Sequence, residues 1–147
     1  MGATIDGTSE WSGGDRPITL VVEDDPLTQV YMRRVLRDRF EVAVANSVAE
    51  AKQQLATNGA RTRVILMDLS LRGLEDGLQL TRALRSDPSW KDLPIIATTA
   101  HAFAQDERNS LDAGCSAYLA KPIEPARLLA TIRRLVPEAF PQENAEG

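Results

Sequence analysis

An uninterrupted apolar run that ends in a single carboxylate constrains this chain more than any other feature of its sequence. Val64 to Met67 are all apolar, and Asp68 follows directly. A run this short and this apolar is typical of a strand that is covered on both faces, as in a parallel sheet between helices. Open α/β sheets bind ligands at the carboxyl ends of their strands. Asp68 is therefore a candidate nucleophile or metal ligand, with a helix N-cap as the structural alternative.

Four more short runs of apolar or β-branched residues recur along the chain, and each is followed by a stretch with helical spacing. The predicted strands are residues 18–22, 40–45, 64–68, 95–99 and 117–120. The predicted helices are about residues 27–39, 47–57, 77–87, 103–113 and 125–135. Because crossovers between parallel strands are right-handed, five such units predict an α/β fold, a doubly wound parallel sheet with helices on both faces.

Length and composition narrow the possible organisation and location of the protein. The 147 residues suffice for one well-buried domain, which we predict over 17–136, between a disordered arm (1–16) and a flexible tail (137–147). A net charge of -4 does not favour binding to nucleic acid or to an anionic membrane. The lone Cys115 excludes an internal disulfide, and no apolar run approaches the roughly 20 residues of a membrane span. We therefore expect a soluble, cytoplasmic protein with no nucleic-acid or membrane partner.

Polar side chains stand at the ends of four of the predicted strands. They are Glu23, Asp24, Asp68, Thr99 and Lys121. Because parallel strands end at one edge of the sheet, we expect these groups to gather there. Three carboxylates about 4 to 6 Å apart would repel by roughly 3 to 4 kcal/mol per pair at an effective dielectric near 20. A divalent cation relieves this repulsion, and Mg²⁺ suits a set of oxygen ligands better than zinc, because the chain has one histidine and one cysteine.

The same groups predict phosphoryl chemistry. With a cation in place, Asp68 can attack a phosphoryl group and form an aspartyl phosphate. Lys121 can then supply a point charge to one phosphoryl oxygen, while the Thr99 hydroxyl donates to another. Asp25, which precedes Pro26, is interpreted as the N-cap of the first helix and not as a metal ligand.

Four motifs in this order resemble the receiver domain of two-component response regulators. They are Val-Val-Glu-Asp-Asp at 21–25, the strand that ends at Asp68, Thr99-Ala100 and Lys121-Pro122. The resemblance covers about residues 17–136. It implies a flavodoxin-like (βα)5 fold with the strand order 2-1-3-4-5.

The resemblance also implies a role for each site residue. Asp68 is expected to be the phosphoacceptor, and Glu23 and Asp24 the acidic pair that holds Mg²⁺. The carbonyl of Ser70 would be a third metal ligand. Catalytic and switch roles are then implied for Thr99, as the switch hydroxyl, and for Lys121, as the phosphate-binding lysine.

Two further expectations concern the last strand. Tyr118 stands where the family places an aromatic side chain that rotates between buried and exposed positions. The resemblance also implies that the Lys121-Pro122 peptide is cis, which a turn can hold because an X-Pro bond is only about 0.5 to 1 kcal/mol less stable as cis than as trans. His101, two residues after Thr99, either faces the incoming water or is a solvated loop residue.

The chain departs from the family pattern in the loop from Leu69 to Asp76. Arg72 stands where the family often has proline, and the Asp76-Gly77 pair comes one residue late. We therefore expect this loop to follow a different course while the chemistry at Asp68 is retained.

The resemblance implies a stand-alone receiver that acts as a switch and not as a turnover enzyme. Its expected phosphoryl donor is a histidine kinase or a histidine phosphotransfer protein. Its expected partner surface is the face formed by helix 103–113, strand 117–120 and the helix after Pro125. One alternative is a phosphorylation-independent interaction domain on the same fold. Another is a haloacid-dehalogenase-type phosphatase, which expects an aspartate where this chain has Ser70.

Overall fold

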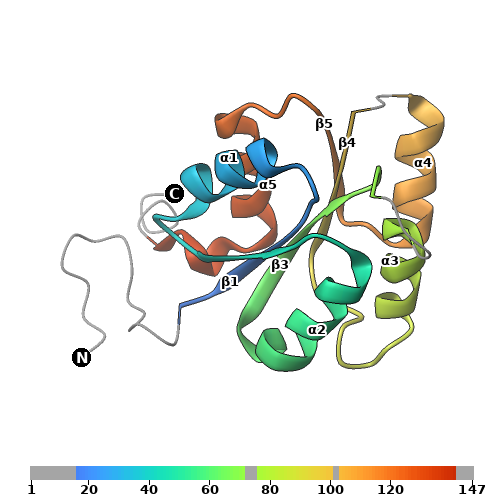
Figure 1. Cartoon of the computed structure of the whole chain (residues 1–147), viewed down its shortest axis with the longest axis horizontal. Helices are drawn as coiled ribbons and strands as arrows, with labels where there is room; N and C mark the ends of the chain where they lie inside the picture. Colours follow the sequence, from blue (N-terminus) through green and yellow to red (C-terminus); the bar gives the residue numbers. More distant parts are fainter. Residues whose placement is uncertain (1–15, 72–75, 101–102, 142–147) are drawn as a thin grey trace.

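Strands and helices alternate along the computed structural model, which describes residues 16–71, 76–100 and 103–141 (Figure 1). The strands are β1 (Ile18–Val22), β2 (Glu41–Ala45), β3 (Thr62–Asp68), β4 (Ile95–Thr99) and β5 (Ala117–Ala120). The helices are α1 (Pro26–Leu36), α2 (Val48–Asn58), α3 (Gly77–Arg85), α4 (Ala104–Ala113) and α5 (Pro125–Leu135). Two short 3₁₀ turns, η2 (Gly59–Arg61) and η3 (Pro137–Ala139), follow α2 and α5.

The strands form one parallel sheet in the order β2-β1-β3-β4-β5, which confirms the predicted fold and strand order. The register aligns the carboxyl ends of the strands. Val22 at the end of β1 lies opposite both Ala45 and Met67. Asp68 at the end of β3 lies opposite Thr98 on β4. The residues that follow these strands therefore share one edge of the sheet.

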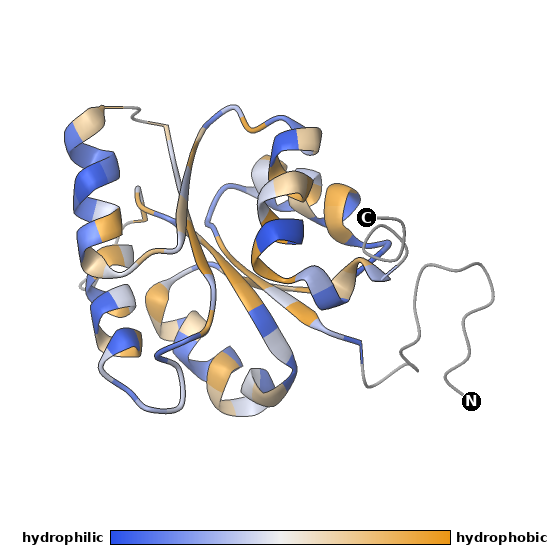
Figure 2. Cartoon of the chain, turned by 180° about the vertical axis from the view of Figure 1, so that it is seen from behind, coloured by the Kyte–Doolittle hydropathy of each residue, from blue (hydrophilic) through white to orange (hydrophobic). Residues whose placement is uncertain are grey.

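Two apolar cores lie on the two faces of the sheet, and Figure 2 shows the apolar strands between helices with polar outer faces. One core joins the sheet to α1 and α5 through residues such as Leu36, Leu66 and Leu128. The other joins it to α2 and α3 through residues such as Leu55 and Leu80. Because both faces are covered, every residue of β1 and of β4 is buried. This burial explains why the strand sequences are continuous apolar runs and do not alternate.

Side chains cap the first three helices at the predicted starts. Asp25 accepts a hydrogen bond from the Thr28 N–H at 2.9 Å, as the N-cap interpretation predicted. Ser47 accepts from the Glu50 N–H at 3.1 Å, but the Glu50 side chain turns to Asn46 and not back to Ser47. Of the two reciprocal bonds of a capping box, α2 thus has only the one that Ser47 accepts.

Helix α1 buries only part of its apolar surface. Leu27 is 80% exposed and Val30 is 54% exposed, whereas Met32 and Leu36 are buried. The helix crosses the sheet with Met32 and Leu36 against the strands. Leu27 lies in the first turn, so the sheet does not cover it.

The packed region extends beyond the predicted start of the C-terminal tail at 137. Pro137–Ala139 form η3, and Phe140 is only 2% exposed. The Phe140 ring packs edge-on against Phe40, with ring centroids 6.4 Å apart, and lies 4.5 Å from the Arg39 guanidinium carbon. An aromatic ring that reaches the α1–α5 core holds this segment in place. Residues 137–140 are therefore packed against the domain in this structure, where a flexible tail was predicted, and residues 142–147 lie outside the described part of the chain.

Three other predictions also fall on residues that are not described. The predicted N-terminal arm lies outside the structure except for Arg16, and the unusual loop does so at 72–75. His101 is likewise outside the described residues. Across 16–71, 76–100 and 103–141, none of the helices combines the length and apolarity that crossing a bilayer requires.

Candidate functional site

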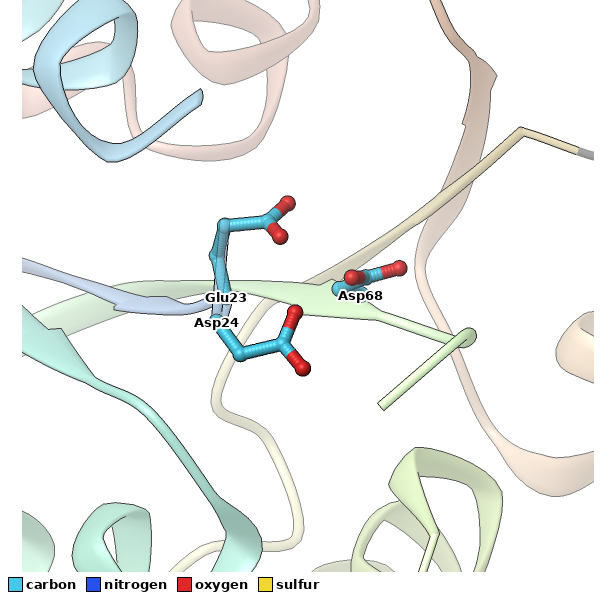
Figure 3. Close-up of side chains that lie close together, drawn as sticks. All are labelled: Glu23, Asp24 and Asp68. Atoms are coloured by element: carbon cyan, nitrogen blue, oxygen red, sulfur yellow. The ribbon is translucent and has the colours of Figure 1, made fainter. Parts of the chain in front are cut away.

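Three carboxylates converge at the carboxyl edge of the sheet, from the ends of β1 and β3 (Figure 3). Oxygen atoms of Glu23, Asp24 and Asp68 all lie within 4.8 Å of one another. Glu23 and Asp68 are each 2% exposed, whereas Asp24 is open to solvent. The site is therefore a shallow acidic pocket with a buried floor and one exposed wall.

The alternation of side chains along the strands brings these groups to one face. Val21 and Leu66 face the core on the α1 and α5 side, as does Leu119 on β5. Side chains two residues apart on a strand point to the same face. Glu23 and Asp68 therefore project to the α1 and α5 side of the sheet.

Lys121 reaches this pocket from the end of β5. Its Nζ lies 2.7 Å from Glu23 Oε1 and 3.6 Å from Asp68 Oδ2. Burial alone lowers the pKa of Lys121, but the hydrogen bond to Glu23 and the nearby charge of Asp68 outweigh it, so the pKa is raised. The ammonium is thus kept protonated between two acids.

The pKa of Glu23 is also raised, but here burial is the main cause and the hydrogen bonds oppose it. Burial raises the pKa of Glu23, although the hydrogen bonds from Lys121 and from the Asp25 N–H oppose this shift. The Asp68 charge adds to the increase. The carboxylate is therefore poorly solvated, and a further positive charge at the pocket would stabilise its ionised form.

Backbone N–H groups orient the two buried carboxylates. The Ser70 N–H donates to Asp68 Oδ1 at 2.9 Å, and the Asp25 N–H donates to Glu23 Oε2 at 3.0 Å. A carboxylate has about four lone-pair positions. Both groups can therefore still accept a ligand while these bonds are kept.

The donor set fits a hard divalent cation. Among the residues that the structure describes, three carboxylates and the ammonium of Lys121 give the pocket a formal charge of -2 when all are ionised. The available donors are oxygens, which Mg²⁺ prefers, and Mg²⁺ typically uses only one or two carboxylates together with water and phosphate. The carbonyl of Ser70, in the loop that follows Asp68, was predicted as a further ligand, and that role stays a prediction.

The loop after β5 is held against α1. The Lys121-Pro122 peptide is cis, as predicted. The next residue, Ile123, accepts a hydrogen bond through its carbonyl from the Tyr31 hydroxyl of α1. This contact ties the lysine-bearing loop to the helix that begins beside the acidic pair.

Thr99 and Tyr118 project from the opposite face of the sheet to Asp68. Thr99 is paired with Ala120, and Tyr118 is paired with Ala97, whose side chain lies in the core on the α2 and α3 side. Thr99 is buried and Tyr118 is half-buried. Burial raises the pKa of Tyr118, and the negative charges of Asp106 and Glu107 on α4 raise it further.

A second row of polar residues, which was not predicted, lies behind the acidic pair. Gln29 Nε2 donates to the Glu23 carbonyl at 2.6 Å and to Asn46 Oδ1 at 2.7 Å. Asn46 in turn donates to Glu50 Oε1 from its backbone N–H and its side-chain amide. Asn46 follows directly after β2, so the strand-end argument used for Glu23 and Asp68 could have found it.

Comparisons with known proteins agree with this geometry. A family model described as response regulator receiver domain matches residues 19–133. The response regulator MprA of Mycobacterium avium is 35% identical over 129 residues, which are 87% of this chain and 54% of MprA. The polar-differentiation response regulator DivK of Brucella ovis is 32% identical over 123 residues, 82% of this chain and 96% of DivK. This chain therefore spans about half the length of MprA and nearly all of DivK.

A solved structure carries a metal in the corresponding fold. The receiver domain of the sensor histidine kinase PA1611 from Pseudomonas aeruginosa, whose crystal structure has a magnesium ion coordinated in the active site cleft, is 34% identical to this chain. The two structures superpose with a TM-score of 0.67 over 81% of this chain and 96% of that one.

Proposed function

The chain belongs to the response regulator receiver family of two-component signalling, and on that premise we propose that it is a switch operated by phosphorylation of Asp68. The observation that carries this proposal is the position of Asp68. Its carboxylate is buried at a strand end, within 4.8 Å of two other acids and 3.6 Å from the Lys121 ammonium. A carboxylate nucleophile needs such charge compensation around it when it meets an anionic phosphoryl group.

The proposed donor is a phosphohistidine of a histidine kinase or of a histidine phosphotransfer protein. An Asp68 oxygen attacks phosphorus, the bond from phosphorus to the imidazole nitrogen breaks, and the leaving imidazole keeps its electron pair and takes up a proton. The Ser70 N–H, 2.9 Å from Asp68 Oδ1, holds the carboxylate in place during this step. In this proposal the transfer takes place in the cytoplasm.

Mg²⁺ would be held by Asp24, Asp68, Glu23 and the carbonyl of Ser70, and when bound it supplies positive charge that offsets the incoming phosphoryl oxygens. Lys121 is already at the pocket, and its ammonium can turn from the carboxylates to a phosphoryl oxygen. Its proposed function is charge stabilisation, which is the main requirement of phosphoryl transfer.

Asp68 is expected to be the sole phosphorylation site. Incubation with Mg²⁺ and a small phosphodonor should add the mass of one phosphoryl group to the intact protein, and chelation of the metal should prevent the gain. Asp68→Asn should abolish the gain, because an amide is not a nucleophile. Asp112→Asn, a change to an exposed acid on α4, is the matched control and should be labelled like the wild type. Labelling that persists in Asp68→Asn would remove the basis of the proposal.

The proposed signal passes through Thr99 to Tyr118. The phosphoryl group brings about -1.5 to -2 charges and new acceptor oxygens, which would recruit the Thr99 hydroxyl. Thr99 and Tyr118 project from one face of adjacent strands, so a shift of Thr99 would change the space available to the Tyr118 ring. The surface that would change is formed by α4, β5 and α5, and we propose it as the site for a downstream protein.

Thr99→Ala should still be phosphorylated but should respond weakly. Driving a switch from 1:99 to 99:1 needs roughly 5.5 kcal/mol of differential stabilisation. One neutral hydrogen bond supplies only about 1 kcal/mol, so Lys121 and the metal must contribute the rest. The response is measured as the change in amide exchange over residues 103–125 on addition of a beryllofluoride mimic. A Thr99→Ala protein that responds as fully as the wild type would exclude this route.

The haloacid-dehalogenase alternative has no support at the residue that distinguishes it. Ser70 offers an N–H to Asp68, whereas that chemistry expects an acid two residues after the nucleophile. Family membership favours a signalling switch over a turnover enzyme.

A further inference from the structure

The Asp24 carboxylate differs from the other two acids in how it is held. Glu23 is held by Lys121 and by a backbone N–H, and Asp68 is held by Ser70. Asp24 is exposed, and no hydrogen bond or ion pair to its side chain occurs among the residues that the structure describes. The direction of the Asp24 side chain therefore depends on its backbone.

Gln29 controls that backbone through the peptide unit that precedes Asp24. Its Nε2 donates to the Glu23 carbonyl at 2.6 Å, and this carbonyl belongs to the planar unit that joins Glu23 to Asp24. The preceding peptide unit, between Val22 and Glu23, is fixed as well, because the Glu23 N–H donates to the Ala45 carbonyl at 2.9 Å. A bond to the carbonyl thus limits the rotation that would swing Asp24 away from Asp68.

The amide of Gln29 is itself oriented by a polar chain that ends on α2. Glu50 Oε1 accepts from the Asn46 side-chain amide at 3.1 Å, so the Asn46 oxygen must face Gln29. That oxygen accepts the second proton of Gln29 Nε2 at 2.7 Å. A flipped amide at either position would place two acceptors against each other. Glu50, Asn46 and Gln29 therefore have one mutually consistent arrangement.

We propose that Gln29, oriented by Asn46 and Glu50, is a positioning residue for the metal site. It holds the Glu23-Asp24 peptide so that the Asp24 carboxylate faces Asp68 before the cation arrives. This inference rests on the proposed function, because it assigns a determinant of Mg²⁺ affinity at that site. Gln29 makes no contact with the cation itself and acts only through Asp24.

The first test is Gln29→Leu, which keeps the size of the side chain and removes the donor. Of the two hydrogen bonds that this variant loses, the bond to the Glu23 carbonyl is the one that holds Asp24, and its loss should raise the Mg²⁺ dissociation constant about three- to tenfold, measured by isothermal titration. In the metal-free protein, the amides of Asp24 and Asp25 should exchange faster than in the wild type. Gln53→Leu is the matched control, since Gln53 is an exposed glutamine on α2, and it should change neither quantity.

The second test exchanges the hydrogen-bond donor and acceptor between positions 46 and 50. Asn46→Asp keeps the acceptor for Gln29 but sets two carboxylates together at Glu50, and it should weaken Mg²⁺ binding in the same direction. Adding Glu50→Gln to this variant places a donor at position 50. The double variant has the same net charge as the wild type. The double variant should recover to within about twofold of the wild-type dissociation constant. A residue that only supported the fold would not show this pattern of loss and recovery at a constant melting temperature.

The outcomes separate this inference from the function on which it rests. If the wild type binds Mg²⁺ and Gln29→Leu binds it equally well, the positioning role is wrong and the proposed function stands. A double variant that binds Mg²⁺ no more tightly than Asn46→Asp would also contradict the proposed role of Asn46 and Glu50. If the wild type itself fails to bind Mg²⁺, the proposed metal site fails, and the positioning role fails with it.

Discussion

Some residues at this site each make two contacts, which support different parts of the structure. Asp25 caps α1 through its side chain, while its backbone N–H orients Glu23. Lys121 pairs with Glu23 and lies near Asp68, so that two strand ends are joined through one ammonium. Such paired contacts leave the buried acids little freedom before any ligand binds. The acidic pocket is thus largely pre-organised at the level of individual side chains.

The carboxyl group of Glu50 should titrate below the ordinary value near 4.3. The Asn46 backbone N–H at 2.7 Å is the largest cause of the lowered pKa, and the Asn46 side-chain amide adds to it. A lowered folded pKa means that Glu50 contributes stability above the unfolded pKa and that this contribution is lost as the pH falls through the folded pKa. The measurement is a carbon NMR titration of the Glu50 carboxyl group.

Asn46→Ala should raise the pKa of Glu50 only part of the way to its ordinary value, because the backbone donor at position 46 remains. Gln53→Leu should leave it unchanged. A Glu50 carboxyl that titrates normally in the wild type would contradict the hydrogen bonds from Asn46.

Close packing between β3 and α3 sets where the third helix starts. Asp76 and Gln79 form a reciprocal capping box, with two hydrogen bonds of 2.8 Å. A Cβ added to Gly77 would lie 2.9 Å from Met67 Cγ and 3.2 Å from the Asp68 carbonyl oxygen. The first residue of α3 therefore has to be glycine for the helix to approach the strand that carries Asp68.

Gly77→Ala should lower the free energy of unfolding by about 1 to 3 kcal/mol, as overpacking does. The direction is diagnostic, because Gly→Ala in an unobstructed helix usually stabilises a protein. Chemical denaturation measures the change. The cost should shrink when the same substitution is made in a Met67→Ala protein, which lacks the Cγ. A stabilised Gly77→Ala protein would show that the strand and the helix are farther apart.

On the scale of the whole molecule, the sheet separates two cores, and the segment after α5 closes one of them (Figure 1). Phe140 packs against Phe40, 100 positions away along the chain, and the Arg39 guanidinium lies over its ring. The core on the α1 and α5 side thus includes η3 and Phe140. We therefore propose that the receiver domain extends to Phe140.

Phe140→Ala should lower the free energy of unfolding by about 3 to 5 kcal/mol, the usual cost of removing a buried aromatic ring. Its exposed neighbour Glu138 provides the control, because Glu138→Ala should stay within about 0.5 kcal/mol of the wild type. Thermal or chemical denaturation would measure both. A loss below about 1 kcal/mol for Phe140→Ala would mean that the ring is not part of the core in solution.

The sequence by itself determined the features that depend on short stretches of chain. The apolar runs predicted all five strands, and β1, β4 and β5 have the predicted bounds. The strand-end argument placed Glu23 and Asp68 in one pocket, because parallel pairing aligns the carboxyl ends whatever the helices do. The N-cap at Asp25 was equally predictable, since a cap bonds to a residue three positions away.

Only the tertiary structure decided which surfaces meet. Helical spacing predicted α1, but the docking of the helix decided that Met32 is buried and Leu27 is exposed. The contact of Phe140 with Phe40 and the bond from Gln29 to Asn46 join residues far apart in the chain. No local pattern encodes such pairs, because their formation depends on the relative placement of elements that are already folded. The acids of the site were thus predictable from the strands that carry them, whereas the polar chain behind Asp24 required the packed molecule.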